Sequence, residues 1–296
     1  MSIAYVFPGQ GSQFPGMGLE LCKRYPLAKR LFDQADEVLG FPLSESMFHG
    51  SDEDLVATRV TQPALFLYAY AAYQCMAELP PAMVAGHSLG EFTALAVSGA
   101  VTFEEALQLV LQRAEAMYQC CLQCSSGMQA VLKFDIQKVE EICQDITDEV
   151  VVANYNSPQQ VVISGTMAGL QLAIERLKAA GARFIIPLKV GGAFHSPLMK
   201  PAQQLLADAI RKTSFQQPVC PIYQNVTAQP SQDPDTIRHN LLDQIDHPVL
   251  WTQSVRNMIR DGADFFVEVG PGNTLQNLIK RTDTKVITKS IFDFKV

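Results

Sequence analysis

The chain has 296 residues, of which 48% are hydrophobic, and a formal net charge of −7. This length and composition can bury a sizeable core, in one large domain or in two unequal ones. The acidic balance argues against nucleic acid as the main partner, and no block of like charges suggests a polybasic membrane anchor. The longest apolar stretch, residues 64–77, is too short to span a bilayer.

The N-terminal segment indicates a first strand and not a signal peptide. Residues 3–7 are apolar, no basic leader precedes them, and Pro8-Gly9 turns the chain. Seven dispersed cysteines are typical of reduced thiols, and the C-x-x-C of Cys121 and Cys124 has no second pair to complete a metal site. We therefore expect a cytoplasmic protein without a bound metal.

The turn after this strand, residues 8–16, is rich in glycine but matches neither phosphate-loop pattern. The dinucleotide pattern needs glycine where Phe14 stands, and the P-loop needs a Lys-Ser/Thr pair that is absent. Two interpretations stay open: a plain glycine turn, or a turn that presents a backbone N–H, such as that of Gln10, to an anion.

Two scaffold helices follow. Apolar residues at helical spacing predict a helix from Pro26 that ends at Gly40. Pro63, read as a first-turn proline, predicts the start of a strongly apolar helix that runs to about Met76.

Residues 86–90 read Gly-His-Ser-Leu-Gly and lie between the apolar run 82–85 and a helical pattern that begins at Glu91. This order is typical of a nucleophile elbow, in which the tight turn needs small residues two positions to either side of the serine. The turn would aim the Leu89 N–H at an oxyanion beside Ser88 Oγ. A tight turn of no chemical importance is the alternative.

The next predicted helix carries an unusual arginine. Thr102 and Glu105 form a capping box for a helix that reaches about Cys121. On that helix Arg113 lies close to the apolar stripe. An arginine so placed either extends to the surface or binds an anion in a partly buried pocket, and the helical spacing alone favours neither.

From Met128 the pattern changes to the β-α-β-β-α-β order of the ferredoxin-like motif. The predicted strands are 128–134, 150–154, 160–164 and 183–188, and the predicted helices are 136–146 and 167–180. We expect a subdomain of residues 126–193 inserted into a catalytic domain of residues 1–125 and 194–296. The cleft between them would be the usual place for a ligand.

His195 follows the predicted subdomain in a loop led by Gly191-Gly192. It is the best candidate base among the five histidines, although a lone loop histidine is more often structural or solvated. His87, by contrast, is expected to point into the layer beneath the elbow. Beyond this loop the pattern predicts helices 201–212, 235–244, 251–260 and 274–281 and strands 221–225, 265–269 and 285–291.

Seven separated motifs, in the same order, closely resemble those of the malonyl-CoA:acyl carrier protein transacylases. They are FPGQGSQ at 7–13, TQPAL at 61–65, GHSLGE at 86–91, QRA at 112–114, QVVISG at 160–165, FHSPLM at 194–199 and EVGPG at 268–272. The resemblance runs through nearly the whole chain. It implies an α/β-hydrolase-like large domain with a mostly parallel sheet and an inserted ferredoxin-like subdomain.

The resemblance also implies roles for the matching residues. Ser88 would be the nucleophile, and His195 would be the general base. Arg113 would anchor the malonyl carboxylate, and the N–H groups of Gln10 and Leu89 would hold the oxyanion. Malonyl-CoA would be a substrate and acyl carrier protein the second partner, with no further cofactor, in a ping-pong transfer that supplies fatty acid biosynthesis.

Two further roles follow from the resemblance. The family has no triad aspartate, so a main-chain carbonyl would orient His195, at the position of Leu250 where many relatives have glutamine. Phe194, the aromatic residue before the histidine, would favour malonyl because a bulky wall leaves no room for a branch at the α-carbon. We expect a monomer that binds neither nucleic acid nor membranes.

Three other functions stay open. A stand-alone acyltransferase of a polyketide or malonate decarboxylase system would share every motif. A serine thioesterase would share the elbow but usually needs an acidic residue to orient its histidine. Between Ser88 and His195, outside the predicted inserted subdomain, none stands at an evident strand exit. A non-enzymatic scaffold would leave Ser88 inert.

Overall fold

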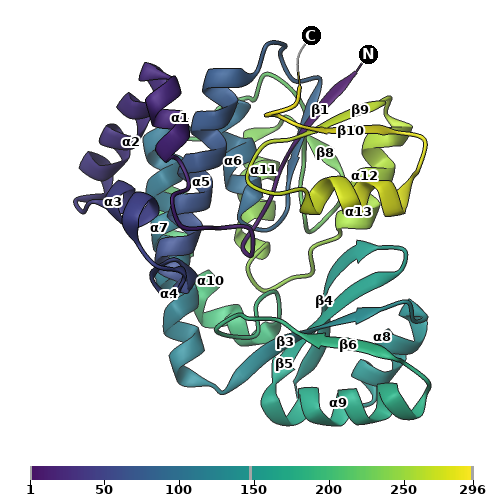
Figure 1. Cartoon of the computed structure of the whole chain (residues 1–296). Helices are drawn as coiled ribbons and strands as arrows, with labels where there is room; N and C mark the ends of the chain where they lie inside the picture. Colours follow the sequence, from purple (N-terminus) through teal and green to yellow (C-terminus); the bar gives the residue numbers. More distant parts are fainter. Residues whose placement is uncertain (1, 147–148, 295–296) are drawn as a thin grey trace.

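A computed structural model describes residues 2–146 and 149–294 of the chain. Within these residues the protein has a large body built on a six-stranded, mostly parallel sheet and a small body built on a four-stranded antiparallel sheet (Figure 1). The predicted α/β class with a mostly parallel sheet is therefore confirmed. The second sheet is contributed by the middle of the chain.

The large sheet has the strand order β10-β9-β1-β2-β7-β8, and β7 and β8 alone pair antiparallel among its described strands. Every residue of β1 is buried, because helices cover both faces of the sheet. Two adjacent residues of that strand illustrate this: Tyr5 packs into one core and Ala4 into the other. The strands are β1 Ile3–Phe7, β2 Met83–Gly86, β7 Ile222–Tyr223, β8 Pro230–Ser231, β9 Phe265–Glu268 and β10 Ile287–Ser290.

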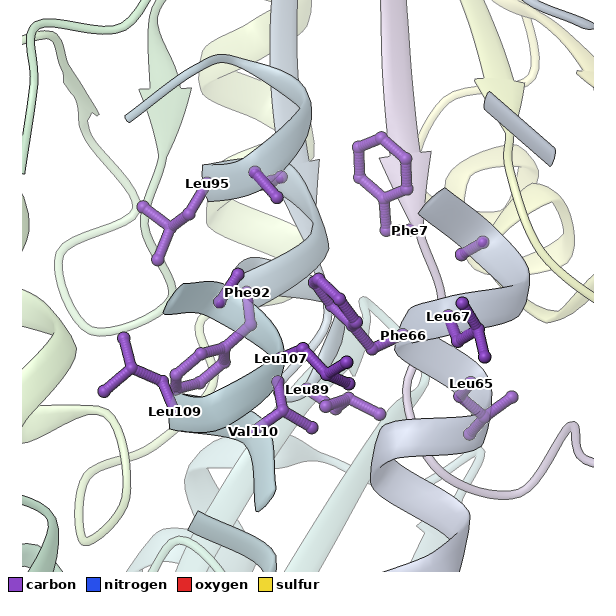
Figure 2. Packing of buried hydrophobic residues seen from close by; sticks show 14 of the residues in the cluster. Phe7, Leu65, Phe66, Leu67, Leu89, Phe92, Leu95, Leu107, Leu109 and Val110 are labelled. Carbon is purple, nitrogen blue, oxygen red and sulfur yellow. The ribbon is translucent and has the colours of Figure 1, made fainter. Parts of the chain in front are cut away.

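Most helices of the large body cover one face of the sheet, and α12 and α13 cover the other. Figure 2 shows side chains that fill the first core between α5, α6 and α7, among them Phe66, Phe92 and Val110. The helices are α1 Leu19–Arg24, α2 Pro26–Leu39, α3 Leu43–His49, α4 Asp52–Val56, α5 Thr58–Met76, α6 Gly90–Val97, α7 Phe103–Gln123, η1 Pro197–Met199, α10 Lys200–Lys212, α11 Pro234–Asp243, α12 Trp251–Arg260 and α13 Thr274–Thr282.

The small body follows the predicted β-α-β-β-α-β order, with the strands arranged β4-β5-β3-β6. Its two helices pack on one face of the sheet, and the other face extends the core of the large body through Met128, Ala130 and Val162. Its elements are β3 Ser126–Leu132, α8 Ile136–Gln144, β4 Val150–Ser157, β5 Gln160–Thr166, α9 Met167–Ala179 and β6 Phe184–Pro187.

Two expectations about helix starts have different outcomes. The capping box of α7 is confirmed, since Thr102 Oγ1 accepts from Glu105 N–H at 3.2 Å and Glu105 Oε2 accepts from Thr102 N–H at 3.2 Å. The start predicted at Pro63 is wrong, because a full turn precedes it, in which Thr61 N–H donates to Ala57 O at 2.8 Å.

None of the helices in the described residues is both long and apolar enough to cross a bilayer.

Candidate active site

Ser88 lies on the turn between β2 and α6, in the left-handed conformation with φ of 53°. The flanking glycines make this turn possible. A Cβ on Gly86 would lie 1.8 Å from Gly90 C, and a Cβ on Gly90 would lie 2.0 Å from Phe7 O in β1. Since neither overlap can be relieved by rotating a side chain, the strand-turn-helix geometry predicted for the elbow depends on both glycines.

His195 contacts the candidate nucleophile directly, with 2.7 Å between its Nε2 and Ser88 Oγ. Its Nδ1 lies 2.9 Å from Gln244 O and 3.2 Å from His247 O. Carbonyl oxygens can only accept, so Nδ1 carries the proton and Nε2 is left to accept the serine proton. The backbone of His195 is also left-handed, with φ of 58°.

The carbonyl of Leu250 does not orient His195, which corrects the prediction from the sequence. Leu250 O accepts instead from Ser254 N–H at 2.9 Å and Ser254 Oγ at 3.0 Å, at the start of α12. The residue that faces the histidine is Gln244, at the end of α11, six positions earlier. The expected departure from glutamine at the histidine-orienting position is therefore wrong, because the carbonyl nearest to His195 Nδ1 is that of a glutamine.

Burial keeps the His195 imidazole neutral. The side chain is nearly inaccessible to solvent, and its desolvation, followed by the nearby Arg113 charge, lowers the pKa of His195 to about 3. The imidazole is therefore unprotonated at neutral pH and free to take a proton from Ser88.

Arg113 points into the protein and not to the surface, being only 1% exposed. Its Nη2 donates to Ser88 Oγ at 2.9 Å and to Gln244 Oε1 at 3.2 Å, and its Nη1 donates to Gln62 Oε1 at 2.6 Å. Burial lowers the pKa of Arg113 to about 10, against the opposing effect of the Glu91 carboxylate, so the guanidinium stays charged at neutral pH. The side chain thus brings a buried positive charge to the nucleophile.

The glutamines beside Arg113 were not identified as site residues from the sequence. Gln62 lies in the TQPAL motif, which indicates the family resemblance but no role for this glutamine. Gln244 contacts three residues of the site. Its Oε1 accepts from Arg113, its backbone carbonyl accepts from His195 Nδ1, and its Nε2 donates to Ser88 O at 2.9 Å. No local pattern indicates this role, since Gln244 reaches the elbow only through the tertiary fold.

A cavity of about 390 Å³ opens beside Ser88 between the two bodies. The site residues predicted from the sequence, apart from Leu250, all line it: Gln10, Ser88, Leu89, Arg113, Phe194 and His195. In the described part of the chain, the backbone N–H groups of Gln10 and Leu89 donate no hydrogen bond. Both groups are therefore available to an oxyanion.

The small body completes the cavity. His87 lines the cavity, and its Nε2 lies 2.8 Å from Asn156 Oδ1 on β4. Its ring centroid also lies 5.6 Å from that of the buried Trp251 of α12, in the layer beneath the elbow, as predicted. At the mouth, Arg281 of α13 donates through Nη1 to Gln160 Oε1 of β5 at 3.0 Å. The hydrogen bonds to Asn156 and from Arg281 join the bodies across the site, and neither of these two residues was singled out in the sequence.

Comparisons with known proteins identify the family of the chain. The family model "Acyl transferase domain" matches residues 4–290. The malonyl CoA-acyl carrier protein transacylase of Bacillus subtilis is 40% identical, over 98% of this chain and 93% of the relative.

Solved structures are similar over nearly the whole length. The malonyl-CoA:ACP transacylase of Synechocystis has a TM-score of 0.92 at 39% identity, covering 98% of this chain and 97% of that one. A malonyl-transacylase in complex with a type II PKS acyl-carrier protein has a TM-score of 0.95 at 34% identity, covering 99% and 97%. With a family model that matches almost the entire sequence, the chain belongs to the acyl transferase family.

Proposed function

We propose that the protein transfers the malonyl group of malonyl-CoA to the phosphopantetheine thiol of an acyl carrier protein through a malonyl-Ser88 intermediate. The observation that carries the proposal is the position of Ser88 Oγ, 2.7 Å from the neutral His195 Nε2 and 2.9 Å from Arg113 Nη2. A base and a carboxylate-binding cation thus meet at one nucleophile. The relatives named above carry the same activity in their names.

In the first half-reaction, His195 Nε2 takes the proton of Ser88 Oγ while the oxygen attacks the thioester carbonyl carbon. The Gln10 and Leu89 N–H groups would hold the oxyanion that forms. The carbon–sulfur bond then breaks, and CoA leaves as a thiol with the proton from His195. In the second half-reaction His195 Nε2 takes the proton of the carrier-protein thiol while the sulfur attacks the carbonyl carbon of malonyl-Ser88. The ester bond to Oγ then breaks, and His195 gives that proton to Oγ.

The choice of acyl group would depend on Arg113 and Phe194. A guanidinium forms two parallel, charge-assisted hydrogen bonds with a carboxylate, which malonyl has and acetyl lacks. Phe194 is buried against the same cavity and would exclude a branch on the α-carbon. No cofactor is needed, since malonyl-CoA is a substrate.

The architecture supports finer assignments. A serine turn after β2 in a parallel sheet is the arrangement of the α/β-hydrolases, and the order β6-β3-β5-β4 with two helices on one face is that of ferredoxin-like domains. We assign residues 126–193 to the inserted subdomain and 1–125 with 194–296 to the catalytic domain. A monomeric state and a cytoplasmic location stay predictions.

A thioesterase is the second candidate, and transfer can be separated from hydrolysis directly. The protein is incubated with labelled malonyl-CoA and an excess of holo acyl carrier protein, and the label is followed in carrier protein and in free malonate. We expect most label on the carrier protein. Release of free malonate as the main product would identify a hydrolase, and carriers from fatty acid and polyketide systems in competition would identify the pathway.

A further inference from the structure

Asn225 holds the nucleophile turn from behind. It lies two residues after the end of β7 and is fully buried. Its Oδ1 accepts from Ser88 N–H at 2.7 Å, and its Nδ2 donates to Gly86 O at 2.6 Å. These two hydrogen bonds bracket the left-handed serine. We propose that Asn225, fixed by Glu91, is a positioning residue that holds Ser88 in place for acyl transfer.

Glu91 gives Asn225 its position. This residue stands in the first turn of α6 and is completely buried, and its Oε2 accepts from Asn225 N–H at 2.8 Å. Its Oε1 accepts from Gln224 Nε2 at 3.3 Å, and Gln224 Oε1 in turn accepts from Asn240 Nδ2 at 2.8 Å. Two donors thus converge on the Glu91 carboxylate, which joins Asn225 to a buried hydrogen-bond network beside the elbow.

The orientation of the Asn225 amide is fixed by the same logic. One side of the amide faces a backbone N–H of Ser88 and the other a backbone carbonyl of Gly86. A flipped amide would set donor against donor and acceptor against acceptor. A side chain with both an acceptor and a donor is therefore required at this position.

The two hydrogen bonds from the Asn225 amide to the elbow backbone bear on catalysis because they fix the backbone on either side of Ser88, the proposed nucleophile. The left-handed region is disfavoured for a residue that has a Cβ, so the conformation of Ser88 needs support from its surroundings. Asn225 also occupies the Ser88 N–H, which leaves Leu89 N–H as the donor that the elbow offers to the oxyanion. A displacement of about 1 Å at a reacting atom can slow a reaction by about 100-fold.

The loss of acylation rate on removing the Asn225 amide should be the same for every acyl group. Among the described residues, the hydrogen bonds of Asn225 go to the elbow backbone, to Glu91 and, through its carbonyl, to Leu250 N–H. None goes to Arg113. Removing the amide should therefore slow acylation by malonyl-CoA and by acetyl-CoA by the same factor, with little change in the half-saturating concentration.

The first test compares Asn225→Ala with Asn240→Ala in the full-length protein. Both remove an amide from the same buried network, but Asn240 does not contact the elbow. Single-turnover acylation without carrier protein should be about 10- to 100-fold slower for Asn225→Ala with either acyl-CoA and within about threefold of wild type for Asn240→Ala. Equal rates for the two variants, or a change confined to half-saturation, would overturn the proposal.

A second variant keeps the test decisive if Asn225→Ala does not fold. In Asn225→Asp, an ionised carboxylate can accept from Ser88 N–H but cannot donate to Gly86 O, whereas a protonated one can do both. Residue 225 is fully buried beside Glu91, whose own pKa burial raises to about 7, and burial likewise disfavours an ionised aspartate, so protonation is within reach at mildly acidic pH. The ratio of the Asn225→Asp rate to the wild-type rate should therefore rise as the pH falls.

A rate ratio that does not change with pH, or an Asn225→Asp variant as fast as wild type at every pH, would refute the positioning role of Asn225. The inference rests on the proposed acyl-Ser88 intermediate, and the two can fail separately. A wild-type protein that is not acylated at Ser88 would refute the proposed function. A wild type that is acylated there, with undiminished rates in the Asn225 variants, would refute only the positioning role.

Discussion

Arg113 is shared among Ser88, Gln62 and Gln244, so its charge is placed before any substrate arrives. Truncating one partner of a buried charge pair costs roughly 3–5 kcal/mol. We therefore expect Arg113→Ala to lower kcat/KM for malonyl-CoA by about 10²- to 10³-fold or more, and to change kcat/KM for acetyl-CoA by less than about tenfold.

Lysine is the matched control at this position. Arg113→Lys should recover only part of the activity, because it supplies the charge without the planar fork that holds a carboxylate at two points. The measurement is kcat/KM for malonyl-CoA and acetyl-CoA with wild type and both variants. Parallel losses for both substrates would show that Arg113 supports the fold or the CoA site and does not recognise the carboxylate.

The buried imidazole of His195 predicts a pH effect on stability. Its pKa is about 3 in the folded protein and about 6.5 when unfolded, so between these values the unfolded state binds one more proton. The free energy of unfolding should therefore fall as the pH falls through this window. Glu91 acts in the opposite sense, because burial raises the pKa of its carboxyl to about 7 and the folded state binds its proton first.

A variant isolates the contribution of His195. Between pH 7 and pH 5 the wild type should lose about 2 kcal/mol more free energy of unfolding than His195→Gln, since only the wild type has this histidine to protonate on unfolding. Denaturant titrations at the two pH values measure the difference. The same pH dependence in both proteins would mean that the imidazole is not held neutral.

Sequence patterns identified the residues proposed to react but not the residues that position them. Ser88 lies within a local motif, and Arg113 on the apolar face of a helix already departs from an ordinary surface arginine. Gln244 and Asn225 show no such signal, because they reach the elbow from distant parts of the chain through the fold. The assignment to Leu250 was wrong for the same reason: spacing along the chain does not say which carbonyl turns toward His195.

At the level of elements, the contact between α6 and β1 sets how closely the elbow can approach the sheet. A Cβ on Gly90 would lie 2.0 Å from Phe7 O, and backbone atoms cannot rotate away. Gly90→Ala should therefore lower the free energy of unfolding by at least about 3 kcal/mol and abolish acylation. Thermal or denaturant unfolding, together with malonyl labelling, measures both effects.

Gly127 provides the comparison for this substitution. On β3, a Cβ would lie 3.6 Å from Met167 Sδ, which is an ordinary contact. Gly127→Ala should leave stability within about 1 kcal/mol of wild type. If both alanine variants behave alike, close backbone packing does not explain the glycines of the elbow.

Long, strongly patterned elements could be predicted from the sequence, and short ones could not. The helix Trp251–Arg260 and the alternation of strands and helices in the small body agree with the structure. Helices α1, α3 and α4 span only five to seven residues, too few to show a clear apolar period. The early start of α5 was missed because Pro63 lies inside the helix and not in its first turn.

At the scale of the whole molecule, the cavity between the two bodies has to admit a carrier protein after CoA leaves. Lys189 is exposed on the connection that leads to the His195 loop. Lys200, by contrast, forms an ion pair in which its Nζ lies 3.4 Å from Asp246 Oδ2. Lys189 forms no ion pair with any residue that the structure describes. Carrier proteins with an acidic surface should therefore be steered by Lys189 more than by the paired Lys200. Lys189→Glu should therefore raise the carrier-protein KM more than Lys200→Glu does.

Salt and the separate half-reactions test this docking prediction. The effect of Lys189→Glu should shrink as the ionic strength rises, because exposed charges are screened. Acylation by malonyl-CoA without carrier protein should be unchanged in both variants. Equal loss in the two half-reactions would place the lysines in the acyl-transfer machinery and not on a docking surface.

The central claim is that Ser88 carries the acyl group, and covalent trapping tests it most directly. The wild type is mixed with malonyl-CoA without carrier protein and quenched in acid, and the labelled peptide is identified by mass spectrometry, with Ser88→Ala treated in parallel. We predict one malonyl group on the peptide that contains Ser88, none on Ser88→Ala, and loss of the label when holo carrier protein is added before the quench. A malonyl group on another residue, or equal labelling of Ser88→Ala, would contradict the account.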